Sequence, residues 1–125
     1  MEPDPTILAL LTALAEPTRL RIVNCLAAAP LFVSELQAIL GVPQPTVSRH
    51  LRVLRDVGLV RDTPVAQFVL YRLRRPPEPL GRVLSAVLDA AQHDAPLVGE
   101  RADAMARSRL HTRTRVVTDT EGHPA

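Results

Sequence analysis

The segment between Gly41 and Gly58 places its apolar and its basic residues on opposite sides of one helix. Three aliphatic side chains share one side at 100° per residue: Val47, Leu51 and Leu54. The opposite side carries a mainly small, polar and basic set: Pro45, Ser48, Arg49, Arg52 and Asp56. Gly41 stands where a left-handed residue closes the preceding helix, and Gly58 ends this one. The pattern predicts a helix over residues 44–57 that buries one stripe and exposes an arginine-bearing face.

A shorter helix and a hairpin flank this segment. Residues 34–40 have the pattern of a short helix that ends at Gly41. Two runs of β-forming residues follow Gly58, with a turn at residues 63–66 between them: 59–61 and 67–73. This order of elements is typical of a winged helix-turn-helix. We expect the helix-turn-helix over about residues 33–58 and the wing over about 59–73.

The rest of the chain is predicted as helix. Asp4 is a good N-cap and Pro5 suits the first turn of a helix whose apolar face runs from Ile7 to Leu14, and a second helix follows Pro17. A proline-rich connector leads to an amphipathic helix over about residues 79–93, which completes a domain over residues 1–95. We expect a further helix over 96–110 and a disordered tail over 111–125. The predicted fold class is mainly α with a small β-hairpin, with about five to six helices and a two-stranded wing.

The distribution of charge favours a polyanionic partner. All fifteen basic residues are arginine, and the isoelectric point is about 9.5. Seven arginines against two aspartates lie between Pro45 and Arg75, a local balance of +5. Only three aromatic residues are present, which argues against proteins that stack single-stranded bases on exposed rings. Double-stranded DNA is the partner that this pattern favours.

Several other classes of protein are excluded. The longest apolar run, residues 26–33, has eight residues, too few to cross a membrane. The acidic N-terminal sequence does not resemble a signal peptide, and a lone Cys25 permits neither an intrachain disulfide nor a cysteine zinc site. No phosphate loop, catalytic triad or carboxylate pair is present. We expect a cytoplasmic protein that is not an enzyme.

The candidate DNA-binding residues follow from the major groove, which admits one helix whose polar side chains contact base edges. The predicted set comprises six residues of the 44–57 helix and two of the hairpin: Gln44, Thr46, Ser48, Arg49, Arg52, Arg55, Arg61 and Gln67. The alternative interpretation of this face is an ordinary solvated helix surface. The hairpin directly after it favours DNA binding.

Four strings of residues resemble the ArsR/SmtB family of winged-helix repressors: Leu14-Ala15-Glu16-Pro17-Thr18-Arg19-Leu20-Arg21-Ile22, Gln44-Pro45-Thr46-Val47-Ser48-Arg49-His50-Leu51, Val53-Leu54-Arg55-Asp56-Val57-Gly58-Leu59-Val60 and Tyr71-Arg72-Leu73. The resemblance spans about residues 5–95. It implies a homodimer that binds a palindromic operator and leaves it when an inducer binds. It also implies that residues 44–52 lie on the recognition helix and residues 61–73 form the wing.

The sequence departs from this family at two places that bear on DNA binding. Pro43 stands where family members carry a side-chain cap, so that cap is absent. The wing tip, residues 62–67, has no positive charge, whereas family wings are usually basic. A dimeric module that binds a protein partner and has little affinity for DNA is therefore the alternative function.

The metal sites implied by the resemblance are missing. Phe32 and Ser34 occupy the positions of the family's metal-binding cysteines, and soft metals need thiolates. Asp89 and His93 match neither string of the second family site. Cys25 lies among aliphatic residues, which predicts a buried, unreactive thiol. We expect no metal, no cofactor and an effector of unknown identity.

An apolar stripe in the 79–93 helix predicts dimerisation. Its members recur at helical spacing and form a patch too apolar to remain exposed: Leu80, Val83, Leu84, Val87 and Ala91. The function predicted from the sequence is a sequence-specific, homodimeric repressor of double-stranded operator DNA.

Overall fold

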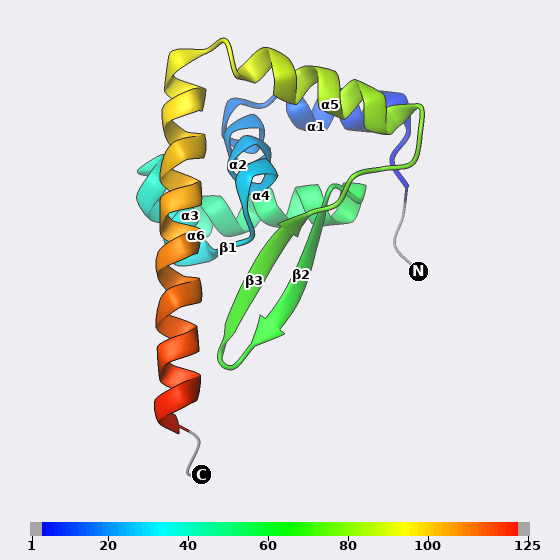
Figure 1. Cartoon of the computed structure of the whole chain (residues 1–125). Helices are drawn as coiled ribbons and strands as arrows, with labels where there is room; N and C mark the ends of the chain where they lie inside the picture. Colours follow the sequence, from blue (N-terminus) through cyan, green and yellow to red (C-terminus); the bar gives the residue numbers. More distant parts are fainter. Residues whose placement is uncertain (1–3, 123–125) are drawn as a thin grey trace.

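The computed structural model describes residues 4–122, with side chains for residues 4–111. Six helices and three short strands follow one another along the chain (Figure 1): α1 (Ile7–Leu14), α2 (Pro17–Ala28), β1 (Leu31–Phe32), α3 (Val33–Leu40), α4 (Gln44–Val57), β2 (Val60–Val65), β3 (Phe68–Leu73), α5 (Leu80–Ala91) and α6 (Ala95–Gly122). The mainly α winged helix-turn-helix predicted from the sequence is confirmed.

The first helix begins later than predicted. Thr6, not Asp4, is its N-cap, and the Thr6 Oγ1 accepts a hydrogen bond from the Ala9 amide at 3.1 Å. Asp4 instead forms an ion pair with Arg74, with 2.8 Å between Oδ1 and Nη2. Asp4 and Thr6 are both residue types that cap helices well. Because Asp4 is paired with Arg74, which is distant in sequence, Thr6 caps the helix instead.

The two glycines that frame the recognition helix adopt left-handed conformations, which the sequence predicts for Gly41. Gly41 has a φ of 69° and ends α3, while Gly58 has a φ of 91° and ends α4. The Gly58 amide donates to the carbonyls of Leu54 and Arg55, which satisfies carbonyls of the last helical turn. The backbone conformations of these two glycines therefore fix the turn between α3 and α4 and the start of the wing.

The predicted two-stranded wing is present as β2 and β3, and a third strand, β1, joins the same sheet. The order is β1-β3-β2, all antiparallel, and Leu31 pairs with Tyr71. A strand of two residues is too short to show an alternating pattern in the sequence. It forms only because its backbone pairs with the edge of β3. The hairpin strands are also longer than predicted, and the turn is Ala66–Gln67. Pro64 lies inside β2, which a strand at the sheet edge tolerates.

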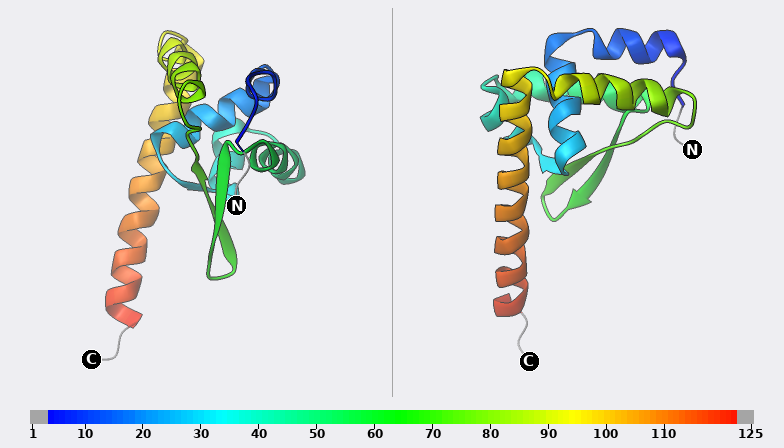
Figure 2. Two further views of the ribbon diagram at one scale, coloured as in Figure 1. Left: turned by 90° about the vertical axis from the view of Figure 1, so that its right-hand side faces the viewer. Right: turned by 45° about the horizontal axis from the view of Figure 1, so that its top comes forward.

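The helices enclose a core of aliphatic side chains from α1 to α5, with one contribution from α6. In Figure 1, α1 and α5 both lie at the top of the molecule, the β2–β3 hairpin projects downward, and α6 descends past α2 and α3. Figure 2 shows α4 and α6 on opposite sides of the hairpin. The face of α4 that turns away from the core is therefore not covered by α6.

A polar seam joins α6 to α2. Asn24 is 1% exposed, donates from Nδ2 to the Leu97 carbonyl at 2.8 Å, and accepts from Arg101 Nη2 at 2.9 Å. Ala104 is fully buried against the same core. The helix continues to Gly122, past its predicted end at Leu110, because no proline or glycine interrupts residues 100–121. The predicted disordered tail over 111–125 falls almost wholly outside the residues whose side chains are described.

Candidate nucleic-acid interface

The amphipathic character predicted for α4 is present in the structure. Val47, Leu51 and Leu54 are buried, with at most 1% exposure. Arg49 and Arg52 are exposed on the opposite side. The buried stripe anchors the helix against α1, α2 and α3, and this packing presents the arginines outward on a rigid support.

The start of α4 carries the small polar members of the predicted set. Gln44 is exposed, and its Nε2 donates to the Ser48 Oγ at 2.8 Å, while Thr46 is half-buried. Pro43 is the N-cap and offers no side-chain hydrogen bond, as expected. Gln44 and Ser48 are therefore ordered relative to each other, and Ser48 lies one helical turn before Arg52.

Arg55 is placed differently from the other arginines of α4. Its Nη1 lies 3.3 Å from the Asp62 Oδ2 on β2, and its Nε lies 3.8 Å from the Asp56 Oδ1. Tyr71 pairs with Asp62 across the hairpin, and burial followed by the Asp62 charge raises the pKa of its hydroxyl. Arg55 thus links the recognition helix to the wing, and its charge is largely compensated.

The wing has a neutral tip. No charged residue occurs from Thr63 to Tyr71, and Gln67 and Phe68 are exposed, Phe68 to 57%. Ala66 has a left-handed φ of 55°, a conformation that glycine or asparagine adopts more readily. The tip therefore presents an apolar and amide surface rather than a basic one.

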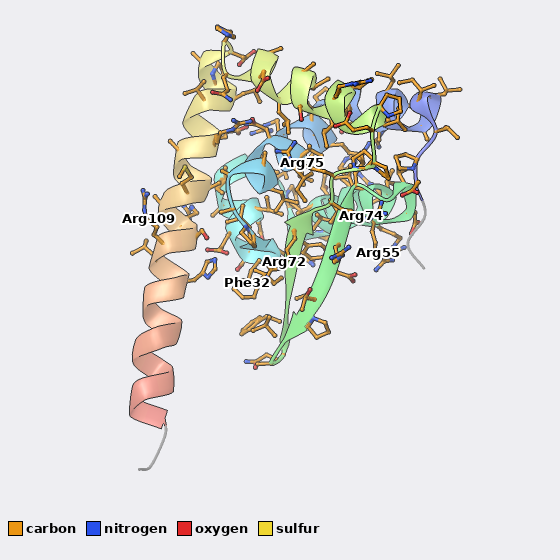
Figure 3. The ribbon with its side chains drawn as sticks, turned by 45° about the vertical axis from the view of Figure 1, so that its right-hand side comes forward. Phe32, Arg55, Arg72, Arg74, Arg75 and Arg109 are labelled. Atoms are coloured by element: carbon orange, nitrogen blue, oxygen red, sulfur yellow. The ribbon has the colours of Figure 1, made fainter. Side chains whose placement is uncertain are left out.

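The positive charge of the wing lies at its base. Arg61 on β2 pairs directly with Arg72 on β3, so two like charges stand opposite each other. Arg72 belongs to the basic patch predicted from the sequence but not to the predicted DNA-binding set. Its pairing with Arg61 depends on the register of the hairpin, which the sequence does not reveal. Figure 3 shows Arg72, Arg74 and Arg75 following one another out of the hairpin, whereas Arg109 lies apart on α6.

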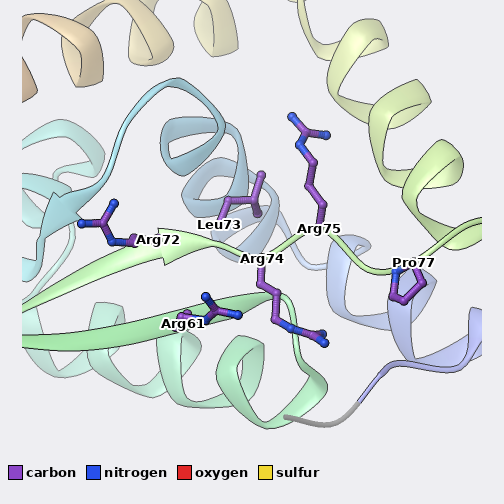
Figure 4. A pocket seen from close by; sticks show the side chains of 6 residues that line it. All are labelled: Arg61, Arg72, Leu73, Arg74, Arg75 and Pro77. Atoms are coloured by element: carbon purple, nitrogen blue, oxygen red, sulfur yellow. The ribbon is translucent and has the colours of Figure 1, made fainter. Parts of the chain in front are cut away.

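A hollow of about 430 Å³ opens beside this base, lined by Arg61, Arg72, Leu73, Arg74, Arg75 and Pro77. The guanidinium groups do not converge on it (Figure 4): Arg72 and Arg75 point in different directions. Arg74 donates to the Gly58 carbonyl at 3.0 Å as well as to Asp4, and Arg75 donates to the Ser85 Oγ at 3.1 Å. The hollow is therefore a basic surface rather than a cage for a small anion.

The predicted dimerisation stripe divides into two parts. Leu84 and Ala91 are buried in the core of their own chain and are not available to a partner. The other three members, Leu80, Val83 and Val87, are half-buried. On α1, at the same end of the molecule as α5, three large aliphatic side chains are exposed to 49%, 72% and 46%: Ile7, Leu8 and Leu11.

The residues considered as sensors do not assemble a site. Phe32 packs edge-on against Phe68 and His111, and Ser34, Asp89 and His93 are exposed. Cys25 is fully buried, and burial raises the pKa of its thiol to about 12. Among residues 4–111, no three metal-binding side chains come together. No helix in the described part of the chain has the length and apolarity needed to cross a membrane.

Comparison with known proteins agrees with this geometry. Residues 16–62 match the family described as "Bacterial regulatory protein, arsR family". The HTH-type transcriptional repressor SmtB of Mycobacterium tuberculosis is 42% identical over 84 residues, which cover 67% of this chain and 58% of SmtB. The regulator CmtR of the same organism is 40% identical over 92 residues, which cover 72% of this chain and 77% of CmtR. The chain thus spans little more than half the length of SmtB.

Solved structures give the same relationship. The transcriptional repressor BigR from Xylella fastidiosa superposes with a TM-score of 0.58 at 31% identity, covering 67% of this chain and 84% of BigR. HlyU from Vibrio cholerae superposes with a TM-score of 0.59 at 32% identity, covering 66% of this chain and 88% of HlyU. These relatives share the domain that contains α4 and the wing.

Proposed function

The chain belongs to the ArsR/SmtB family of winged-helix transcriptional regulators, and from this premise we propose that it is a homodimeric repressor that binds a specific operator in double-stranded DNA. The observation that carries the proposal is the exposed face of α4. It combines Arg49 and Arg52 with Gln44 and Ser48 on a helix whose other side is firmly packed. Such side chains form hydrogen bonds with base edges in the major groove.

The proposed contacts divide into base and phosphate contacts. Arg49 and Arg52, with Gln44, Thr46 and Ser48, face the major groove. Arg61 and Arg72 at the wing base approach the phosphate backbone. Arg55 is paired with Asp62 and so contributes little to these contacts, and Gln67 at the tip makes at most a polar contact. A protein that binds operator DNA in this way works in the cytoplasm.

The proposed dimer uses α1 together with α5. Leu8 is 72% exposed on α1, and Leu80, Val83 and Val87 offer half-buried aliphatic groups on α5. Two apolar helix surfaces at the same end of the molecule are an unfavourable arrangement for an isolated protomer. A twofold dimer through this face would bring two α4 helices to successive half-sites of a palindrome.

Selection of bound duplexes from a random pool tests the DNA-binding function. We expect a palindromic consensus, and the recovered duplex should bind at least a thousandfold more tightly than a scrambled one at physiological salt. Recovery of no consensus, together with equal affinity for all duplexes, would favour the alternative of a partner-binding module. The neutral wing tip is the feature that supports this alternative.

Sedimentation tests the dimer. We expect the wild-type protein to be a dimer at micromolar concentration and Leu8→Asp to be a folded monomer with greatly reduced operator affinity. Leu110→Asp is the matched control, because Leu110 is also exposed, to 61%, but lies on α6. A Leu8→Asp protein that remains dimeric would refute the proposed interface.

Release of the operator is proposed to be independent of thiophilic metals. Phe32 and Ser34 supply no thiolate, and Cys25 is buried with a raised pKa. Arsenite, zinc and cadmium at micromolar concentration should therefore leave the operator complex intact. Metal-dependent release that Asp89→Ala or His93→Ala abolishes would contradict this expectation.

A further inference from the structure

We propose that Arg21 is a positioning residue for DNA binding, which couples the C-terminal helix α6 to the turn that orients the recognition helix. The inference rests on the proposed function, because its effect is on operator affinity. Arg21 lies on α2, but its guanidinium group contacts two other helices, α3 and α6. It has no place in the predicted DNA-binding set.

The first contact is at the end of α3. The Arg21 Nη2 donates to the Leu40 carbonyl at 3.0 Å. Leu40 is the last residue of α3, and Gly41, in its left-handed conformation, follows directly. Carbonyls at a helix C-terminus lack intrahelical partners and carry a partial negative charge, so a guanidinium is a favourable donor there. Arg21 therefore holds the carbonyl that borders the turn into α4.

The second contact holds Arg21 itself. Its Nε lies 3.1 Å from both carboxylate oxygens of Glu100 on α6, and its Nη2 contacts the same carboxylate. The side chains of Arg21 and Glu100 are only 31% and 16% exposed, respectively. The hydrogen bond to Glu100 raises the pKa of Arg21, so the group stays charged. A bidentate carboxylate fixes the plane of a guanidinium, which restricts where its remaining donor points.

The opposite end of α3 also contacts α6. His111 packs edge-on against Phe32, with ring centroids 5.2 Å apart, and its Nε2 lies 3.5 Å from the Glu35 Oε1. The same Glu35 oxygen accepts the Phe32 amide at the start of α3. Thus α6 touches α3 near its first residues directly and reaches its last carbonyl through Arg21. Figure 1 shows α6 lying along this part of the molecule, away from the exposed face of α4.

The consequence is a specific role for Arg21 beyond general stability. α3 is the first helix of the helix-turn-helix, and a shift of its C-terminal end moves the start of α4. Gln44 and Ser48 lie in the first turns of α4, where base contacts are concentrated. A displacement of about 1 Å is enough to weaken hydrogen bonds to base edges, whose donor–acceptor distances span only a few tenths of an ångström.

The test compares Arg21→Gln with a charge-swapped double variant, Arg21→Glu with Glu100→Arg. We expect Arg21→Gln to lower operator affinity about tenfold or more and to reduce the margin over a scrambled duplex. The swap restores an ion pair between α2 and α6 but puts at position 21 a carboxylate, which cannot donate to the Leu40 carbonyl. It should therefore recover thermal stability without recovering operator affinity.

Two further measurements complete the design. The amide resonances of Gly41 and Val42 should shift in Arg21→Gln and stay shifted in the swap. Arg107→Gln is the matched control: it removes an ion pair that lies wholly within α6, to Asp103, with 2.9 Å between Nε and Oδ1. It should leave affinity and both resonances unchanged.

The outcomes are distinct from those that test the proposed function. A wild-type protein that binds no selected duplex refutes the function itself. A wild-type protein that binds, beside a folded Arg21→Gln protein of equal affinity, refutes only the positioning role. If Arg21→Gln does not fold, the swap decides alone, and its recovery of full operator affinity overturns the proposal.

Discussion

The recognition helix and the wing are both exposed, yet they place their arginines in opposite ways. On α4, Arg49 and Arg52 project from the middle of the outward face. On the hairpin, Arg61 and Arg72 are near the domain, and the residues from Thr63 to Tyr71 are uncharged. The helix is thus suited to contact bases, and the wing base is suited to contact phosphates. The difference predicts that this chain contacts DNA through α4 and the base of the wing, with little contribution from the tip.

The largest effect is expected from Arg49→Ala. A base-reading arginine contributes about 1–3 kcal/mol of discrimination, and a dimer presents it twice, so the specific complex should lose about 2–6 kcal/mol. Titration of the selected operator and a scrambled duplex measures the loss. Arg109→Ala is the control, since Arg109 is an exposed arginine on α6. Equal weakening of both duplexes would mean that Arg49 contacts only phosphate.

Arg61→Ala should act on salt dependence rather than on specificity. Removing two phosphate contacts per dimer should reduce the slope of log K against log salt by about 1.8. The measurement is operator affinity at four or more salt concentrations. Specific and scrambled duplexes should weaken in parallel, and a loss of discrimination would assign base contact to the wing base.

Asp62→Ala should have a smaller effect. It breaks the link between Arg55 and the wing, a partly exposed ion pair that contributes at most about 1 kcal/mol to the free energy of unfolding. Chemical denaturation measures this change. Freed from its partner, Arg55 should slightly raise affinity for any duplex. A strong fall in operator affinity would instead show that the link orients the wing for binding.

The smallest effect is expected at the wing tip. Gln67→Ala should change operator affinity by no more than a few-fold, because the tip is neutral. Ala66→Gly should stabilise the hairpin by about 1 kcal/mol at most, since glycine adopts the left-handed φ of 55° without the Cβ penalty. If Gln67→Ala reduces the preference for the operator over a scrambled duplex more than Arg49→Ala does, the wing tip rather than α4 determines sequence specificity.

The features that were predictable from the sequence are the local ones. Gly41, Gly58 and the aliphatic stripe of α4 each express a preference of nearby residues, and all three are confirmed. The family resemblance and the order of elements are also confirmed. The DNA contacts of individual side chains stay predictions.

The features that were missed depend on residues far apart in the chain. The helix start moved from Asp4 to Thr6 because Arg74, 70 positions away, pairs with Asp4. The short strand β1 exists through its pairing with β3. Helical spacing alone could not show that Leu84 serves its own core rather than a partner. Nor could it show that Arg55 faces Asp62, which depends on the register of the hairpin.

The buried amide of Asn24 makes α2 and the first part of α6 a single cooperative unit of unfolding. Its partners, Leu97 and Arg101, both belong to α6. Detachment of α6 would break these hydrogen bonds, each of which contributes about 1 kcal/mol. In native-state hydrogen exchange, the amides of both helices should therefore open with the same free energy. A chain shortened to end before Ala95 would lose part of its folding free energy along with its last helix.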